Sequence, residues 1–391
     1  MILRRLFLPL CLILLAPTLR AQTEFDLVMP NSRAAALGGY HTALADDFQT
    51  LFANPAGLLD VEPRFSYSEL TIGASGPVFS LASIVMQSLG GSDFATLLAS
   101  PSVQDLLRSI YARFSLAGPI SFGYAGAGMG FGVFNDSQMI VQSTGSSALE
   151  IRVGERFLLR GGYGLGIPLP ESWNSRLAVG LGLKGFVRGD AVIATSLLTL
   201  PTLVESIGPE LLTESPFELV SGIGVDAGLR WVWSETLAAA VTVDSLYSPN
   251  GVVRYPTLSG FLDSSGTPSE PVYDTYPQEV NLGLAYTPSL GGVGRYVQDF
   301  TLLYDYSDVF DFWIDRDNAE NLALKMSLGV EATFLEVLSV RGGFAQGLFA
   351  AGLGIDLTYL ELNAAMFGTE LSSEPGLRPV YNLIVGLEFR G

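Results

Sequence analysis

The sequence predicts an all-β fold: a transmembrane antiparallel β-barrel of about 14 strands, with an N-terminal plug and helical external loops. Three observations predict it. The 391-residue chain is 48% apolar and 15% charged, yet after residue 21 it has no apolar run of the roughly 18 residues that a spanning helix needs. Several segments alternate between apolar and polar or small residues. Tight turns alternate with long connections, which is typical of outer-membrane barrels.

The first 21 residues have the layout of a secretory signal. A basic start with Arg4 and Arg5 precedes a short apolar run, and Ala21 is the expected last residue before cleavage. A membrane anchor is the alternative, but the run is too short to span comfortably. We therefore expect a signal peptide over 1–21, a plug over 22–63 and a barrel over 64–391, exported to the outer membrane.

Period-two alternation identifies the strands. It is clearest in 176–188, 279–286, 324–334 and 381–389, where one face carries large apolar residues and the other polar or small ones. Fifteen segments have this strand character. Because bacterial barrels contain an even number of strands, we expect 64–86 to form one long or bent strand, which leaves 14.

A soluble β-sandwich or β-helix is the alternative fold. Charges on the second face of strand after strand argue against it, since a sandwich core would not accept them. Aromatic residues also lie near the strand ends, as in a girdle at the membrane interface. They are Trp231, Trp233, Tyr286, Tyr304, Tyr306, Tyr359, Tyr381 and Phe389.

Two long connections have helical patterns, over 101–114 and 200–213. Ser100 is the expected N-cap of the first, with Pro101 at its first position. We expect both helices on the external side. They would either pack on each other as a lid or capture an apolar ligand. The apolar residues proposed for capture are Leu106, Leu107, Ile110, Leu203, Val204 and Ile207.

Residues 22–63 do not alternate, and their small residues suit close packing in a confined space. Within them, Ala36-Leu37-Gly38-Gly39, Ala43-Leu44-Ala45-Asp46-Asp47 and Asn54-Pro55-Ala56-Gly57-Leu58 resemble the N-terminal hatch of the FadL-like long-chain fatty acid transporter superfamily. The resemblance is strongest to its shorter branch, which includes spirochaete outer-membrane proteins. The hatch residues are Gly38, Gly39, Asp46, Asp47, Asn54, Pro55 and Ala56.

The resemblance implies a 14-stranded barrel with a plug, and uptake of hydrophobic molecules across the outer membrane. It also implies lateral release through the barrel wall. The chain is shorter than the classical transporters, and relatives with such a hatch also take aromatic hydrocarbons or serve protein secretion. Gly118-Pro119 would mark either a wall opening or an ordinary strand start.

A fatty-acid carboxylate would need a cation beside an apolar slot. Lys184 and Arg188 share one face with Phe186 between them, which makes them the first candidates; Arg160 and Lys325 are the others. The alternative is that these cations pair with acids facing the lumen and join wall to plug. Those acids are Asp226, Asp244, Asp305, Glu331, Asp356, Glu361 and Glu388.

Composition excludes several functions. The net charge of −18 argues against nucleic-acid binding. The single cysteine, Cys11, lies in the signal, and the single histidine, His41, has no nucleophile motif beside it. We expect no enzyme activity, metal or cofactor. The predicted function is passive uptake of hydrophobic molecules, foremost long-chain fatty acids, across the outer membrane, whose lipid surrounds the barrel. The alternatives are a barrel of a secretion or surface-anchoring complex with protein partners, and a polar porin.

Overall fold

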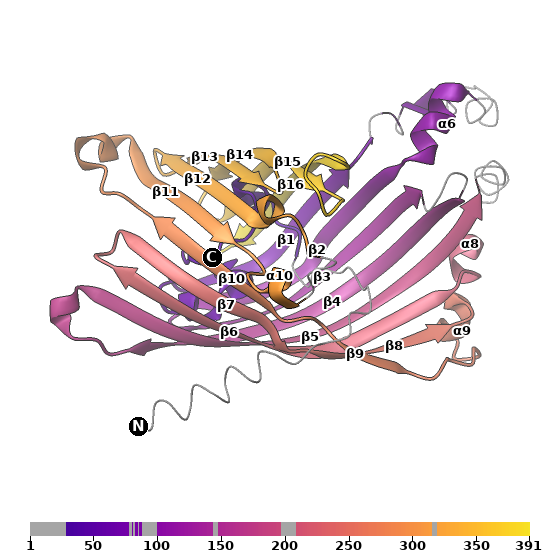
Figure 1. Cartoon of the computed structure of the whole chain (residues 1–391), viewed down its shortest axis with the longest axis horizontal. Helices are drawn as coiled ribbons and strands as arrows, with labels where there is room; N and C mark the ends of the chain where they lie inside the picture. Colours follow the sequence, from indigo (N-terminus) through magenta and orange to yellow (C-terminus); the bar gives the residue numbers. More distant parts are fainter. Residues whose placement is uncertain are drawn as a thin grey trace.

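The computed structural model describes residues 29–77, five positions between 80 and 87, and residues 100–143, 148–196, 209–314 and 319–391 (Figure 1). The predicted signal peptide lies outside these residues. Among the described helices, none is both long and apolar enough to cross a bilayer.

The described chain consists mainly of strands. They are β1 (Arg64–Ser75), β2 (Tyr111–Gly126), β3 (Met129–Ser143), β4 (Ala148–Ile167), β5 (Ser175–Ser196), β6 (Phe217–Trp233), β7 (Leu237–Tyr247), β8 (Pro249–Tyr255), β9 (Val272–Thr275), β10 (Glu279–Tyr286), β11 (Val297–Tyr306), β12 (Met326–Phe334), β13 (Leu338–Ala345), β14 (Leu348–Asp356), β15 (Leu360–Glu370) and β16 (Pro379–Arg390). The helices are α2 (Ser32–Leu37), α3 (Thr50–Ala53), η1 (Pro55–Leu59), α6 (Pro101–Arg108), η2 (Glu171–Trp173), α8 (Pro209–Thr213), α9 (Leu258–Leu262), η3 (Gly291–Arg295), α10 (Asp311–Ile314) and η4 (Leu322–Lys325).

The strands close into one antiparallel barrel. Strand β1 pairs with β2 on one side and with β16 on the other, and β5 pairs with β6 to complete the ring. Strands β7 and β8 both pair with β6 and so form one interrupted wall strand, which β9 and β10 follow as the next. The ring therefore has 14 wall strands, which confirms the predicted number. The segment 64–86 contributes one of them, β1, but that strand ends at Ser75.

Large apolar side chains cover the outside of the ring. In β5, Leu181 and Leu183 are 60% and 64% exposed, and the girdle residues Trp233 and Tyr381 are 49% and 64% exposed. Inward neighbours such as Lys184 and Asp226 are buried. An apolar exterior around a polar interior is the pattern of a barrel in lipid, so the sandwich alternative is wrong.

The wall is much taller on one side. The tall wall, β2–β6, has strands of 15 to 22 residues, whereas strands β10–β14 of the short wall, β10–β16, have 8 to 10 (Figure 1). Since about 9–11 residues span a bilayer, the tall wall continues far beyond it. The predicted strand over 176–188 is correspondingly too short at its outer end, because β5 continues to Ser196 in the protruding part of the sheet, where the outward-facing residues need not be apolar.

The predicted external helices are only partly present. Helix α6 begins at Pro101 after Ser100, as predicted, but ends at Arg108. Ile110 therefore lies beyond the helix and is 2% exposed, so the predicted extent to residue 114 is wrong. Helix α8 begins at Pro209, whereas Leu203, Val204 and Ile207 lie outside the described residues. At the outer end of the tall wall α8 lies beside α9, and α6 stands above β2 (Figure 1).

Gly118-Pro119 lies inside β2 and not at a strand start, so that interpretation is wrong. The ladder between β1 and β2 is interrupted between Ser66 and Thr71. The side-chain oxygen of Asn135 accepts a hydrogen bond from the backbone N–H of Ile120 at 2.9 Å, in place of a strand partner. Proline is tolerated here because the strand is bulged.

Residues from Met29 up to β1 lie inside the barrel. Helix α2 packs against the short wall at β12–β16, and η1 packs against β4, β5 and β6 of the tall wall. Glycines on the inward faces allow this approach. A Cβ on Gly343 would lie 2.4 Å from the carbonyl carbon of Leu37, and one on Gly180 would lie 2.2 Å from the backbone nitrogen of Ala56.

We expect Gly343→Val to displace the plug, because the added side chain would overlap backbone that cannot yield as a flexible side chain would. The expected result is a folded barrel with a raised ion conductance in planar bilayers. Gly376→Val is not a suitable control. A Cβ there would meet nothing within 4 Å, but the backbone angle φ is +81°, so any side chain would strain the backbone. Gly185→Val, on the open outer face, is the matched control. Equal conductance of the two variants would contradict the prediction.

Candidate functional site: a plugged lumen with an apolar row

Arg33 is the central ionic anchor of the plug. Its guanidinium contacts Asp46 and Asp47 of the plug at 2.6 and 2.5 Å, and Glu331 of β12 at 2.5 Å. Arg341 of β13 also donates to Glu331, at 2.6 Å. Burial alone would lower the pKa of Arg33, but the facing carboxylates of Asp46, Glu331 and Asp47 hold it well above its usual value. The arginine therefore stays charged and ties the plug to the short wall.

His41 attaches the plug to the wall, and Asn54 joins two parts of the plug. His41 Nδ1 lies 2.6 Å from Asp305 Oδ2 of β11, and its Nε2 lies 3.0 Å from the carbonyl oxygen of Leu37. Asn54 accepts from the backbone N–H of Ala56 at 2.9 Å and donates to the carbonyl of Thr42 at 3.0 Å. Each side chain is almost fully buried. Both side chains therefore have structural hydrogen-bond partners, which fix their positions in the plug.

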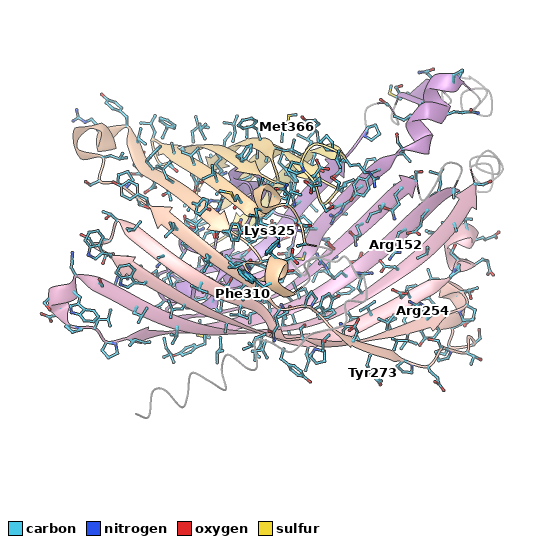
Figure 2. All side chains as sticks on the ribbon, in the orientation of Figure 1. Arg152, Arg254, Tyr273, Phe310, Lys325 and Met366 are labelled. Carbon is cyan, nitrogen blue, oxygen red and sulfur yellow. The ribbon has the colours of Figure 1, made fainter. Side chains whose placement is uncertain are left out.

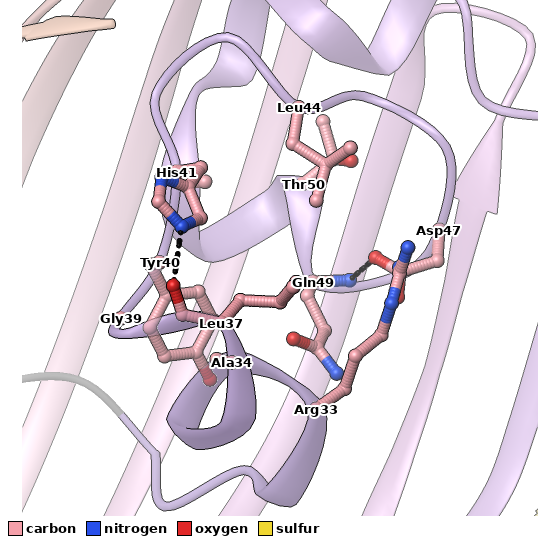
Figure 3. Close-up of a pocket in the computed structure, with 11 residues that line it drawn as sticks. Arg33, Ala34, Leu37, Gly39, Tyr40, His41, Leu44, Asp47, Gln49 and Thr50 are labelled. Carbon is pink, nitrogen blue, oxygen red and sulfur yellow. Dashed lines mark hydrogen bonds and ion pairs between the residues drawn. The ribbon is translucent and has the colours of Figure 1, made fainter. Parts of the chain in front are cut away.

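The remaining hatch residues shape the plug backbone. Gly38 has φ +88° at the end of α2, and Gly39 follows with φ +130°, conformations that favour glycine. Pro55 starts η1 after the Asn54 cap. A small pocket within the plug is lined by Arg33, Tyr40, His41, Asp47 and their neighbours (Figure 3). Burial raises the pKa of Asp47, against the opposing effect of Arg33.

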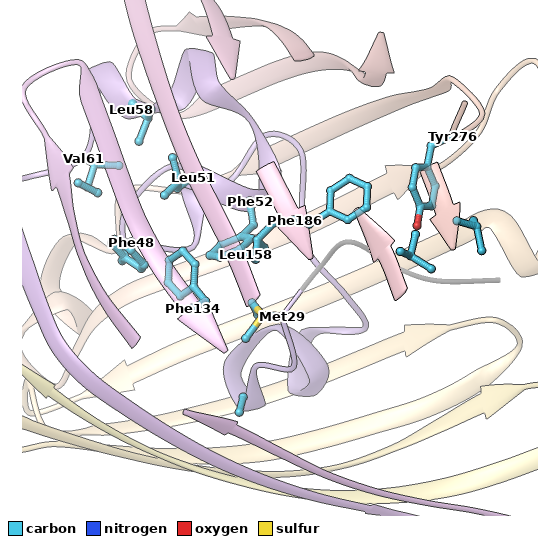
Figure 4. Packing of buried hydrophobic residues seen from close by; sticks show 14 residues of the cluster. Met29, Phe48, Leu51, Phe52, Leu58, Val61, Phe134, Leu158, Phe186 and Tyr276 are labelled. Carbon is cyan, nitrogen blue, oxygen red and sulfur yellow. The ribbon is translucent and has the colours of Figure 1, made fainter. Parts of the chain in front are cut away.

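An apolar row crosses the lumen face of the tall wall. Phe134 of β3 lies opposite Leu158 of β4, which lies opposite Phe186 of β5. All three are at most 4% exposed. Plug residues Phe48 and Phe52 pack on Phe134, with ring centroids 5.7 and 5.0 Å apart (Figure 4). Beyond β5 the row continues to Tyr276, whose ring centroid lies 5.4 Å from that of Phe186.

Two rows of cations flank the apolar row. Two residues further out along each strand, Arg156 lies opposite Arg188; two residues further in, Arg160 lies opposite Lys184. Arg156 donates to Asp136 at 2.9 Å, and Arg188 donates to Asp190 at 2.5 Å. Both cations of the inner row reach one carboxylate, that of Asp226.

Asp226 accepts from Arg160 at 2.8 Å and from Lys184 at 2.7 Å. Arg160 also donates to the carbonyl oxygen of Phe52 at 3.3 Å and lies over its ring, 5.1 Å from the centroid. The inner cation row therefore contacts both the plug and the wall. Pairing with a lumen acid, the predicted alternative, is what the structure shows for Lys184.

The structure brings together three of the four candidate cations. Lys184, Arg188 and Arg160 flank the apolar row, whereas Lys325 (Figure 2) directly precedes β12 at the outer end of the short wall. Lys325 donates to Asp311 of α10 at 2.6 Å and so anchors the connection before β12. Sequence reasoning missed Arg156, although it has the same parity in β4 as Arg160. It also missed Asp136 and Asp190, which only the strand register brings next to arginines.

The fold and the lumen define the class: a transmembrane β-barrel of 14 wall strands with an internal N-terminal plug. No family model and no curated protein matches the chain. The solved structures that are similar to it include the CymD monoaromatic hydrocarbon channel (13% identity, 94% of this chain and 98% of that one, TM-score 0.48), the Ralstonia pickettii toluene transporter TbuX (12%, 92% and 97%, 0.48) and the Pseudomonas putida toluene transporter TodX (13%, 93% and 99%, 0.45).

Proposed function

We propose that this barrel is a channel for passive uptake of hydrophobic molecules, foremost long-chain fatty acids, with lateral release into the bilayer. One observation carries the proposal: the lumen holds an apolar row, Phe134, Leu158 and Phe186, with a row of cations on each side. An apolar chain would lie along the row, and its carboxylate would meet a guanidinium or ammonium group.

The charges make an anionic ligand a better fit than a neutral one. A carboxylate would form charge-assisted hydrogen bonds with Arg188 or Lys184, in competition with Asp190 or Asp226. Toluene, the molecule named for two of the similar structures, has no group that could do so. Because Phe48 and Phe52 cover the Phe134 end of the row, passage of a ligand beyond this point requires the plug to move.

The test is binding of a fluorescent long-chain fatty acid to the detergent-folded barrel, with unlabelled oleate and toluene as competitors. We expect saturable binding that oleate displaces more effectively than toluene. Replacing Lys184 and Arg188 together with alanine should weaken binding about tenfold or more, since two charge-assisted partners are removed. Arg295→Ala, at an exposed position outside the lumen rows, is the control and should bind as wild type.

Binding that survives the double replacement would keep the function and discard the carboxylate site. Absence of any binding that oleate displaces would overturn the proposal. The secretion-barrel alternative would then be tested by isolating the barrel with its stably bound partners.

A further inference from the structure

The hydrogen-bonded wall is interrupted where β7 ends and β8 begins. Strand β6 pairs with β7 up to Val225, opposite Tyr247, and with β8 from Gly222, opposite Asn250. Between these pairs lies Pro249, which has no N–H to donate. Ser248 Oγ instead donates to the carbonyl oxygen of Ile223 at 3.2 Å. Opening the wall here would therefore break fewer backbone hydrogen bonds than opening a continuous ladder.

The outer surface is hollowed at the same place. An open groove with a volume of about 650 Å³ crosses β3–β6, β8 and β9. Its lining includes the small residues Gly185, Ser221 and Gly251 and apolar side chains such as that of Ile223. A Cβ on Gly185 would meet nothing within 4 Å. Tyr273, at the edge of the groove, is 80% exposed on the outer face (Figure 2).

On the lumen side, two aromatic rings cover the interruption. A Cβ on Gly222 would lie 2.5 Å from Phe186 Cζ, so that ring lies directly over the glycine. Tyr276 packs edge-on against Phe186 and donates its backbone N–H to the carbonyl of Ser248 at 3.0 Å (Figure 4). The side chain of Lys184 passes over Gly224 in the same way. The Phe186 end of the apolar row thus lies on the lumen face of the wall at β5, β6 and β8, and the groove lies on the outer face of the same strands.

We infer that molecules leave the lumen sideways through this interruption, with Phe186 and Tyr276 closing it on the lumen side and the outer groove receiving the apolar chain. The inference rests on the proposed function and assigns its exit. The interrupted ladder at Gly118 in β2 is, by contrast, tightly packed: a Cβ there would lie 1.8 Å from the carbonyl oxygen of Glu69. It also has an Asn135 side chain in place of the missing backbone partner.

A disulfide staple tests the exit. Ser221 and Gly251 lie directly opposite each other across β6 and β8, outside the lumen, and the chain after residue 21 contains no cysteine. In Ser221→Cys/Gly251→Cys barrels reconstituted in lipid vesicles, oxidation should slow transfer of fluorescent oleate into the bilayer at least tenfold. A reductant should restore the rate. Binding in detergent should remain at the wild-type level.

Leu338→Cys/Ile355→Cys provides the matched control, because these residues face each other across β13 and β14 on the opposite wall. Its oxidation should leave transfer unchanged. As a second variant, Phe186→Ala should speed transfer several-fold by removing the lumen-side cover. Wild-type transfer in the oxidised staple, or slower transfer in Phe186→Ala, would overturn the inference. Loss of displaceable binding in the unmodified barrel would instead overturn the proposed function.

Discussion

Arg33→Met is expected to release the plug and to destabilise the barrel by about 3–5 kcal/mol, the usual cost of leaving a buried charge without its partner. Asp46, Asp47 and Glu331 would then face one another without the guanidinium that now joins them. The two consequences would be measured as a lower urea midpoint for unfolding in vesicles and a higher single-channel conductance in planar bilayers.

Arg176→Met is the matched control. Arg176 also contacts two carboxylates, those of Asp60 and Glu235, but its side chain is 53% exposed. Exposed ion pairs contribute only about 0–1 kcal/mol, so its unfolding midpoint and conductance should stay close to wild type. If Arg33→Met and Arg176→Met behaved alike, the ionic contacts of the plug would not be what holds it in the lumen.

Asp190→Asn is expected to tighten oleate binding about tenfold, which corresponds to roughly 1.4 kcal/mol. Asp190 is buried and accepts from Arg188 at 2.5 Å. Asparagine keeps the shape but removes the charge, so the arginine would have a stronger preference for the carboxylate of a ligand. Competition by unlabelled oleate against a fluorescent fatty acid measures the effect, and toluene competition should not change.

Asp226→Asn makes the same change at the inner cation row, where Asp226 serves both Arg160 and Lys184. Comparing the two variants identifies the row that meets the ligand: the variant with the larger gain marks it. If neither changes oleate binding while both remain folded, the lumen cations do not contact the carboxylate, and the ligand is recognised by its apolar part.

Much of the fold could be predicted because a barrel in lipid imposes period-two alternation on each strand. Segment 176–188 shows it: its leucines and valines point to lipid, and Lys184, Phe186 and Arg188 point inward. The outer end of β5, beyond residue 188, could not be predicted in this way. It protrudes beyond the bilayer, where the lipid-facing half of the pattern is no longer required.

The candidate site was predictable only in part. Alternation places Lys184, Phe186 and Arg188 on one face of one strand, but says nothing about which residues face them from neighbouring strands. The register aligns Phe134, Leu158 and Phe186 into one row and brings Arg156 opposite Arg188. Lys325 has a similar pattern in sequence, yet it serves as an anchor for α10.

The sequence by itself determined the barrel, its number of wall strands and the residues that face lipid, because these follow from local periodicity and from the even strand number of a closed antiparallel ring. Only the tertiary structure decided the partners of the lumen cations, the glycines that the plug approaches and the place where the wall is interrupted. Those contacts join residues far apart in the chain, as Arg33 joins Glu331, and they depend on strand register, which shifts at each bulge.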